Sequence, residues 1–122
     1  MPSSTLSLNP TDSSTFTGAA FSGLLAAAER EEFVKVYVVR FEPGARTFWH
    51  AHSGPQILVV TAGRCRYQRA GEEIRELRAG ESVRFEPGVR HWHGAAEAEG
   101  TEHVAINLDA RETDWQEEAD SA

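Results

Sequence analysis

The sequence predicts an all-β protein whose short strands form a single sandwich or barrel. From Val34 onward, runs rich in β-branched and aromatic residues follow one another, and each is closed by Gly, Pro, Asp or Asn. Regular short strands of this kind are typical of sandwiches and barrels. The length of 122 residues suits one buried core and is too small for two domains. We therefore expect one barrel.

The N-terminal part of the chain has a different composition. Residues 1–15 contain few large apolar groups and many Ser, Thr and Pro, so they cannot offset the entropy lost on ordering. We expect a flexible arm there, followed by a single domain over residues 16–115 that starts with a short edge strand at 16–21. Residues 24–33 (LLAAAEREEF) alone have a helix-forming composition. They predict a short helical segment near the N-terminus.

Strand-like runs then occupy most of the remaining chain. In order they are KVYVVRFEPG, TFWHAH, QILVVTAG, RCRYQRAG, EIRELRAG, SVRFEPG, HWHGAA and EHVAINLD. After Leu108 the composition becomes acidic, and Trp115 is the one large apolar anchor. Residues 116–122 are expected to be a solvated tail.

Charge and composition exclude several classes of protein. The formal net charge is -7, and no basic stripe is present that could neutralise phosphates, which argues against nucleic acid or anionic membranes as partners. No apolar run reaches the ~18 residues of a membrane helix, and no secretory signal pattern opens the chain. Cys65 is the only cysteine, so no internal disulfide can form. We expect a cytoplasmic protein, with Cys65 as a small core residue.

Four of the five histidines fall in two matched pairs. His50 and His52 are two residues apart, and so are His91 and His93. Residues two apart on a strand point to the same face, so each pair places two imidazoles side by side. Gln56 follows the first pair after a Gly-Pro break that can return the chain toward it. The pattern indicates a metal site.

These two segments resemble the two sequence motifs of the cupins. The first motif, Gly, five residues, His-x-His, three or four residues, Glu, six residues, Gly, is matched by Gly44, His50, His52, Gln56 and Gly63, with Gln56 in the place of the usual Glu. The second is matched by Gly80, Gly88 and His91, with Glu86 and Ala95 in place of the usual Pro and Asn. The resemblance implies a jelly-roll β-barrel.

A closer resemblance covers about residues 16–115. The runs FEPGART-WH-H, Q-L-VTAG and HWHGAA, with a later His103, are similar to small single-domain cupins. That group includes manganese-dependent hydroxynitrile lyases and carboxymuconolactone decarboxylase-like proteins. The resemblance implies one divalent transition metal, with Mn the first choice over Fe, Ni, Co or Zn.

The expected metal ligands are His50, His52, Gln56 and His91. Imidazoles and a carbonyl oxygen suit a divalent transition metal with open positions for substrate. A neutral Gln56 in place of Glu leaves the ion a stronger Lewis acid and removes a carboxylate base. The alternative for Gln56 is a buried amide that orients a histidine.

His103 and His93 are the candidate acid–base residues, because an imidazole can move a proton at neutral pH. His103 is the first choice as base if its strand turns it toward the cavity, and the alternative is a position on the wet face. His93 is either a fourth imidazole ligand or a neighbour of the ligands.

Period-2 alternation through His50 and His52 places Arg46 and Phe48 on the inner face too. Arg46 is therefore a candidate substrate contact, unless it caps the barrel mouth or pairs with an acid such as Glu42. The same alternation turns Trp49 and Trp92 outward, with Ile57 and Val59. Outward apolar groups need a cover, which a homodimer or the arm or helix of the same chain would supply.

Two classes of function fit these residues. The first is a metal-dependent enzyme on a small organic substrate, either a Lewis-acid lyase that cleaves or forms cyanohydrins or a dioxygenase. Gln56 favours the lyase, because cupin dioxygenases commonly use a glutamate there. The second class is a non-catalytic cupin that binds a small ligand.

Overall fold

The computed structural model describes residues 6–27, 33–109 and 111–119, and over these it is entirely β-structure. The strands are β1 (Asn9–Pro10), β2 (Phe16–Thr17), β3 (Ala20–Ala27), β4 (Val34–Phe41), β5 (Arg46–Thr47), β6 (His50–His52), β7 (Gln56–Arg69), β8 (Arg75–Arg78), β9 (Ser82–Phe85), β10 (His91–Ala95), β11 (Thr101–Leu108) and β12 (Thr113–Trp115). The expected all-β barrel is confirmed. No helix in the described ranges is long and apolar enough to cross a membrane.

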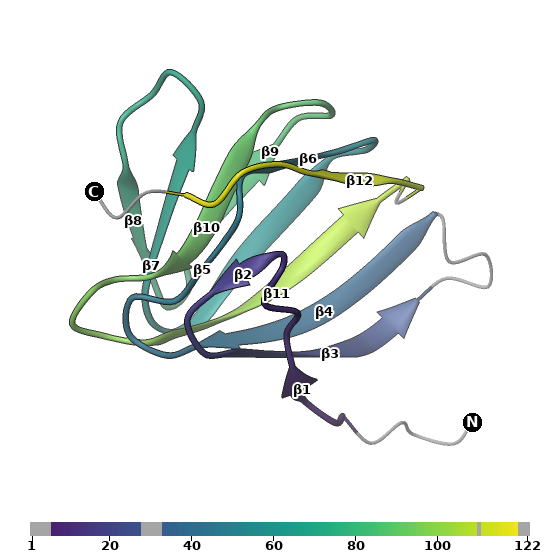
Figure 1. Cartoon of the computed structure of the whole chain (residues 1–122). Coiled ribbons are helices and arrows are strands. Elements are labelled where there is room, and N and C mark those ends of the chain that lie inside the picture. Colours follow the sequence, from purple (N-terminus) through teal and green to yellow (C-terminus); the bar gives the residue numbers. More distant parts are fainter. Residues whose placement is uncertain (1–5, 28–32, 110, 120–122) are drawn as a thin grey trace.

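The strands form one curled antiparallel sheet (Figure 1). Its order is β1-β3-β4-β11-β7-β10-β5-β2, with β8 and β9 also paired to β7 and with β6 paired to β10 and β12. The first half of β7 pairs with β11 and β9, and the second half pairs with β10 and β8. One long strand therefore belongs to both walls of the barrel.

Gly63 lies where β7 passes from one wall to the other. Its φ is +74°, and a Cβ there would lie 2.0 Å from the Gly100 carbonyl oxygen. Only glycine combines this backbone angle with so close a contact. The closing Gly of the first motif is thus required by the bend in β7.

The expected helix over residues 24–33 is wrong for residues 24–27, which belong to a strand. Leu24 and Ala26 belong to β3, where they pair with Tyr37 and Val36 of β4. Residues 28–32 lie outside the described residues. Cross-strand pairing along β4 has overridden a weak local preference for helix.

The expected arm and tail are partly structured. Asn9 pairs with Ser22 and Pro10 pairs with Phe21 at the edge of the sheet, whereas residues 1–5 are outside the described ranges. At the other end, the backbone of residues 116–117 bonds to Trp49. Both ends of the described chain therefore add to the barrel.

Two groups of buried apolar side chains fill the barrel. One consists of Ala20, Val39, Phe41, Ala45 and Ala95. The other consists of Leu58, Tyr67, Val83, Phe85 and Ala105. Cys65 is fully buried, as expected for a small core residue.

Trp92 is buried within the single chain, with only 1% of its surface exposed. Alternation does turn it away from His91 and His93, but the Arg46 guanidinium covers its ring at 4.8 Å, and its indole N–H donates to Gln68. Of the two covers expected for Trp92, the same chain supplies one, although through Arg46 rather than through the arm or a helix. Trp49 is half-buried, with Arg90 stacked on its ring at 4.2 Å. A homodimer remains a prediction that does not depend on Trp92.

We predict that Trp92→Ala lowers the free energy of unfolding by about 3 to 5 kcal/mol, because it empties a large buried site. Arg75→Ala, on the exposed face of β8, is the control and should change stability by less than ~0.5 kcal/mol. Urea unfolding of both variants measures this. Equal stability of the Trp92 variant and the wild type would contradict the burial.

Candidate metal centre and its pocket

The two histidine pairs meet because β6 and β10 are neighbours. His91 of β10 lies directly opposite His50 of β6 in the antiparallel register. Their ring centroids are 4.4 Å apart, and His52 lies 4.9 Å from His50 and 5.5 Å from His91. The pairing thus gathers imidazoles that are about forty residues apart in the chain.

Backbone carbonyls hold two of these rings. The Nδ1–H of His50 donates to the Phe48 oxygen at 2.8 Å, and that of His91 donates to the Val89 oxygen at 2.8 Å. A neutral imidazole that donates through Nδ1 keeps a lone pair on Nε2. His50 and His91 therefore present metal-binding nitrogens toward each other.

Gln56 faces the same point. Its Nε2 donates to the Asn107 Oδ1 at 2.8 Å, and this orientation leaves its Oε1 3.1 Å from the His91 Nε2. Both of these facing atoms are acceptors when His91 is neutral. The Nε2 of His52 is also buried, with no hydrogen-bond partner. Converging lone pairs without a proton between them are the donor set that a cation satisfies.

The spacing also fits a metal. The donor atoms of His50, His91 and His93 lie within 4.8 Å of one another, and these three residues could hold an ion. Two ligands at ~2.1 Å from one transition metal are at most ~4.2 Å apart, so small ring movements suffice. Of the expected ligands, His50 and His91 belong to this group of three, and His93 joins them. Gln56 faces His91, and His52 lies beside both rings but is not one of the three.

His103 lies behind this group rather than in the pocket. It is fully buried, and its Nε2 is 3.0 Å from the Nδ1 of His93. On β11 it lies opposite Val60 of β7 and Val39 of β4, and it contacts His93 but is not among the residues that line the pocket. His93 is thus the one of the two that lines the pocket.

Burial keeps these histidines neutral. Desolvation, and then the neighbouring His91 and His52, lower the pKa of His50 well below 6.5. Desolvation lowers the pKa of His52 to about 4 and of His91 to about 3. It also lowers the pKa of His93 well below 6.5 and that of His103 to about 4. Neutral imidazoles are the form that binds metal.

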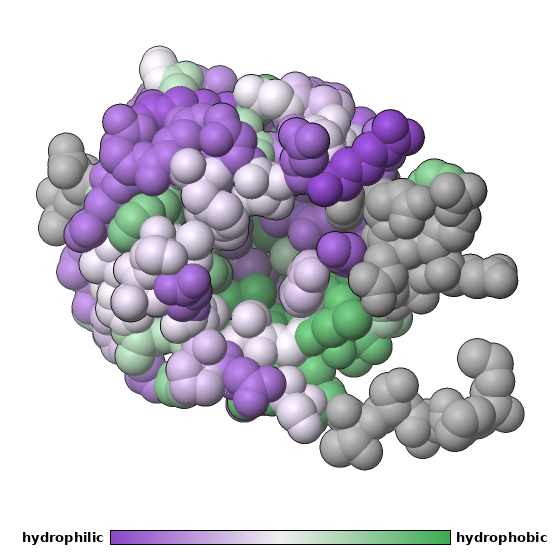
Figure 2. All heavy atoms as spheres, turned by 45° about the vertical axis from the view of Figure 1, so that its right-hand side comes forward, coloured by the Kyte–Doolittle hydropathy of each residue, from purple (hydrophilic) through white to green (hydrophobic). Residues whose placement is uncertain are grey.

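His50, His52 and His93 lie at the wall of a pocket of about 300 Å³. Figure 2 shows the molecule hollowed on the side where β4 begins and β11 ends. The pocket is lined by Phe16, Ser22, Lys35, Tyr37, Val39, Thr47, His50, His52, Gln56, His93, Ala105, Asn107, Leu108, Thr113 and Trp115. This volume is at the lower end of the range for small-molecule sites.

Alternation did not predict the face of Arg46 correctly, and Phe48 is not among the residues that line the pocket. The pocket is lined by Thr47 instead, and Arg46 lies on the other face against Trp92, with Glu97 2.9 Å from its guanidinium. The physical reason is that β5 ends at Thr47, and β6 begins at His50 after two residues outside any strand. The alternation therefore restarts between them. Arg46 is therefore not among the residues that line the pocket, and its role as a substrate contact stays a prediction.

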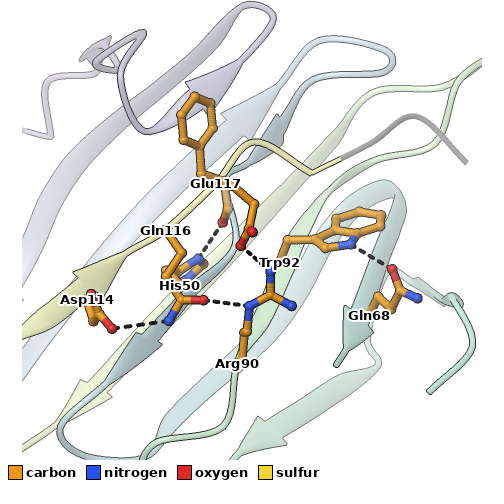
Figure 3. A network of polar contacts seen from close by, with 8 residues as sticks. His50, Gln68, Arg90, Trp92, Asp114, Gln116 and Glu117 are labelled. Carbon is orange, nitrogen blue, oxygen red and sulfur yellow. Dashed lines mark hydrogen bonds and ion pairs between the residues drawn. The ribbon is translucent and has the colours of Figure 1, made fainter. Parts of the chain in front are cut away.

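The segment around β12 packs against the site, where the sequence predicted only one apolar anchor, Trp115, before a solvated tail. Trp115 lies opposite His50, with ring centroids 4.6 Å apart, and the Thr113 hydroxyl is 3.0 Å from the His52 Nδ1. Arg90 holds the next residues, Gln116 and Glu117, as Figure 3 shows. A lone tryptophan among acidic residues was the only sequence signal for this role.

Comparisons with known proteins agree with this fold. Residues 37–107 match the Cupin domain family. The chain is 44% identical over 104 residues to an "(R)-mandelonitrile lyase" of Granulicella tundricola, covering 84% of this chain and 79% of that protein. It is 40% identical to the structure of a cupin-like protein from Thermotoga maritima, with a TM-score of 0.87 over 92% of this chain and 86% of that one. KdgF from Halomonas sp. shares the fold, with a TM-score of 0.70 and 19% identity over 87% and 88% of the two chains.

The histidine cluster predicts acid sensitivity of the metal-free protein. Below pH 6.5 the unfolded chain protonates these histidines, whereas the folded chain excludes a proton from His103 until about pH 4. Stability is therefore fully present above pH 6.5 and is lost as the pH falls from 6.5 toward 4. His103 alone should contribute about 3 kcal/mol of this loss. Urea unfolding between pH 7.5 and 4 measures it, and His103→Phe should flatten the slope. An identical slope in both proteins would contradict the buried neutral histidine.

We also predict about one divalent transition metal per chain in protein purified without chelators. His50→Ala and His91→Ala each remove a nitrogen at the centre of the cluster, so both should lose most of the metal in elemental analysis. Arg75→Ala is the matched control. Full occupancy in both histidine variants would show that the cluster is not the metal site.

Proposed function

The chain belongs to the cupin family, and on this basis we propose that it is a metal-dependent lyase that cleaves or forms cyanohydrins. The observation that carries the proposal is the neutral donor set around His50, His91 and Gln56, which opens on a small pocket. The mandelonitrile lyase of Granulicella tundricola, 44% identical, supports the choice of reaction.

We assign the metal to His50, His52, Gln56 and His91, with manganese as the first ion to test. The metal content of His93→Ala distinguishes this set from the alternative in which His93 is a ligand. Our set predicts that the variant retains its metal, and the alternative predicts that it loses metal. Bound there, a divalent ion would polarise the hydroxyl or carbonyl oxygen of the substrate as a Lewis acid. A neutral Gln56 leaves more of the ion's charge to act on that oxygen.

His93 is the residue we propose as proton acceptor, in place of His103. It lines the pocket, and its Nδ1 is already engaged with His103, so its Nε2 is the nitrogen left for substrate. In cleavage, the hydroxyl proton passes to this nitrogen while the carbon–carbon bond breaks and its electron pair leaves with cyanide. The proton then passes to cyanide, which yields hydrogen cyanide and the aldehyde. His103 keeps the His93 ring oriented.

The pocket walls would position the substrate. Phe16, Val39 and Trp115 present apolar surface, and Thr47 and Thr113 add hydroxyls beside the histidines. An aromatic or branched group of a cyanohydrin would lie against the apolar side, because burial of its carbon surface is favourable. Cover by Trp115 also limits access of water to the reacting atoms.

We predict that the metal-loaded protein cleaves mandelonitrile at the same rate under nitrogen and under air. Gln56→Glu adds a negative charge beside the ion, so it should keep its metal and lower kcat by about tenfold or more. Release of benzaldehyde, oxygen uptake and metal content are measured together for both proteins.

Each outcome of this experiment separates the candidate functions. Oxygen uptake without aldehyde release would favour a dioxygenase, and no turnover of either kind would favour a ligand-binding cupin. Unchanged aldehyde release by Gln56→Glu at equal metal content would remove the argument that the neutral amide tunes the metal. Gln56→Asn, which keeps the amide on a shorter stem, is the control for position rather than charge.

A further inference from the structure

Lys35 is the only lysine of the chain, and it lines the pocket. It lies on β4 two residues before Tyr37 and four before Val39, and both of these also line the pocket. Because side chains two apart on a strand share a face, the three form one row on the concave side of the sheet. Lys35 stands at the end of the row where β4 begins, and Figure 2 shows the molecule hollowed on the side where this strand starts.

The strand register relates Lys35 to the metal centre. Lys35 is paired with Asn107 of β11, and Asn107 is paired with Gln56 of β7. Neighbouring strands are about 4.8 Å apart, so the Cα atoms of Lys35 and Gln56 are about 10 Å apart across the row. The flexible stem of Lys35 can therefore place its ammonium on the far side of a small ligand whose oxygen lies beside Gln56.

The charges in the pocket favour an anion. Among the lining residues there is no Asp, Glu or Arg, and Lys35 is the one lysine. Within residues 6–27, 33–109 and 111–119, no ion pair with a carboxylate neutralises it. A divalent metal would add further positive charge. The protein as a whole has a net charge of -7, so this cationic interior contrasts with an acidic exterior.

We propose that Lys35 is a specificity-determining residue that binds a carboxylate of the substrate while the reacting oxygen lies at the histidine cluster. This inference rests on the proposed lyase function and narrows its substrate to small aldehydes, and their cyanohydrins, that carry a carboxylate. One ammonium matches one carboxylate. A phosphate carries about two negative charges, whereas Lys35 is the only Lys or Arg among the residues that line the pocket.

The test compares pairs of ligands that differ in charge but not in shape. Calorimetric titration of the metal-loaded protein with 4-(hydroxymethyl)benzoate and with 4-(hydroxymethyl)benzamide gives the preference for the carboxylate. We expect the wild type to bind the carboxylate about tenfold more tightly. Lys35→Gln should abolish the preference and Lys35→Arg should retain it. Arg75→Gln, which changes the net charge equally on an exposed part of β8, should leave it unchanged.

Two results would overturn the inference. One is a wild type without preference for the carboxylate. The other is a preference that survives in Lys35→Gln, which would mean that the metal itself binds the carboxylate. Lys35→Gln should also lower the ratio of kcat/KM for the cyanohydrin of 4-carboxybenzaldehyde to kcat/KM for mandelonitrile, whereas Arg75→Gln should leave this ratio unchanged. The binding measurement does not depend on turnover. If the protein prefers the carboxylate through Lys35 but cleaves no cyanohydrin, only the proposed lyase function is contradicted.

Discussion

The register between β6 and β10 is the constraint on which the site depends. It sets His91 opposite His50, and the period of two then adds His52 and His93 to the same side. A shift of one residue would turn either pair out of the barrel. The carbonyls of Phe48 and Val89 complete the arrangement, because each lies two residues before a histidine and accepts its Nδ1–H. Local backbone and strand pairing together aim the lone pairs of both rings at one point.

Burial of so many imidazoles has an electrostatic cost that shapes the rest of the pocket. Desolvation disfavours the charged form of each ring, and no described carboxylate stands in the pocket lining to restore it. The centre is therefore built from neutral donors, including an amide where many cupins have a carboxylate. A cation placed there meets no compensating negative charge, so its pull on a bound oxygen is undiminished. The same lack of carboxylates means that no Asp or Glu lines the pocket beside the Lys35 ammonium.

The outer face of β10 illustrates how a small barrel covers its own apolar groups. Gly94 has no side chain, and a Cβ there would lie 2.6 Å from the Arg46 Cβ, so Arg46 can cross β10 and lie on Trp92. Glu97 pairs with the guanidinium at its far side. Arg90 covers Trp49 in the same way and also holds the segment after β12. Since Trp115 of β12 contacts His50, this outer packing is connected directly to the metal centre.

The sequence alone determined the strand-rich fold, the two histidine pairs and the inclusion of Gln56, because spacing of two on a strand and the glycine-closed turns are local properties. The tertiary structure decided which faces neighbouring segments share. It restarted the alternation between β5 and β6, sent Arg46 outward, set His93 in front of His103 and drew residues 24–27 into a strand. It also brought Lys35, Tyr37 and Trp115 to one pocket. These outcomes depend on pairing between segments far apart in the chain, and no local pattern encodes the register of such pairs.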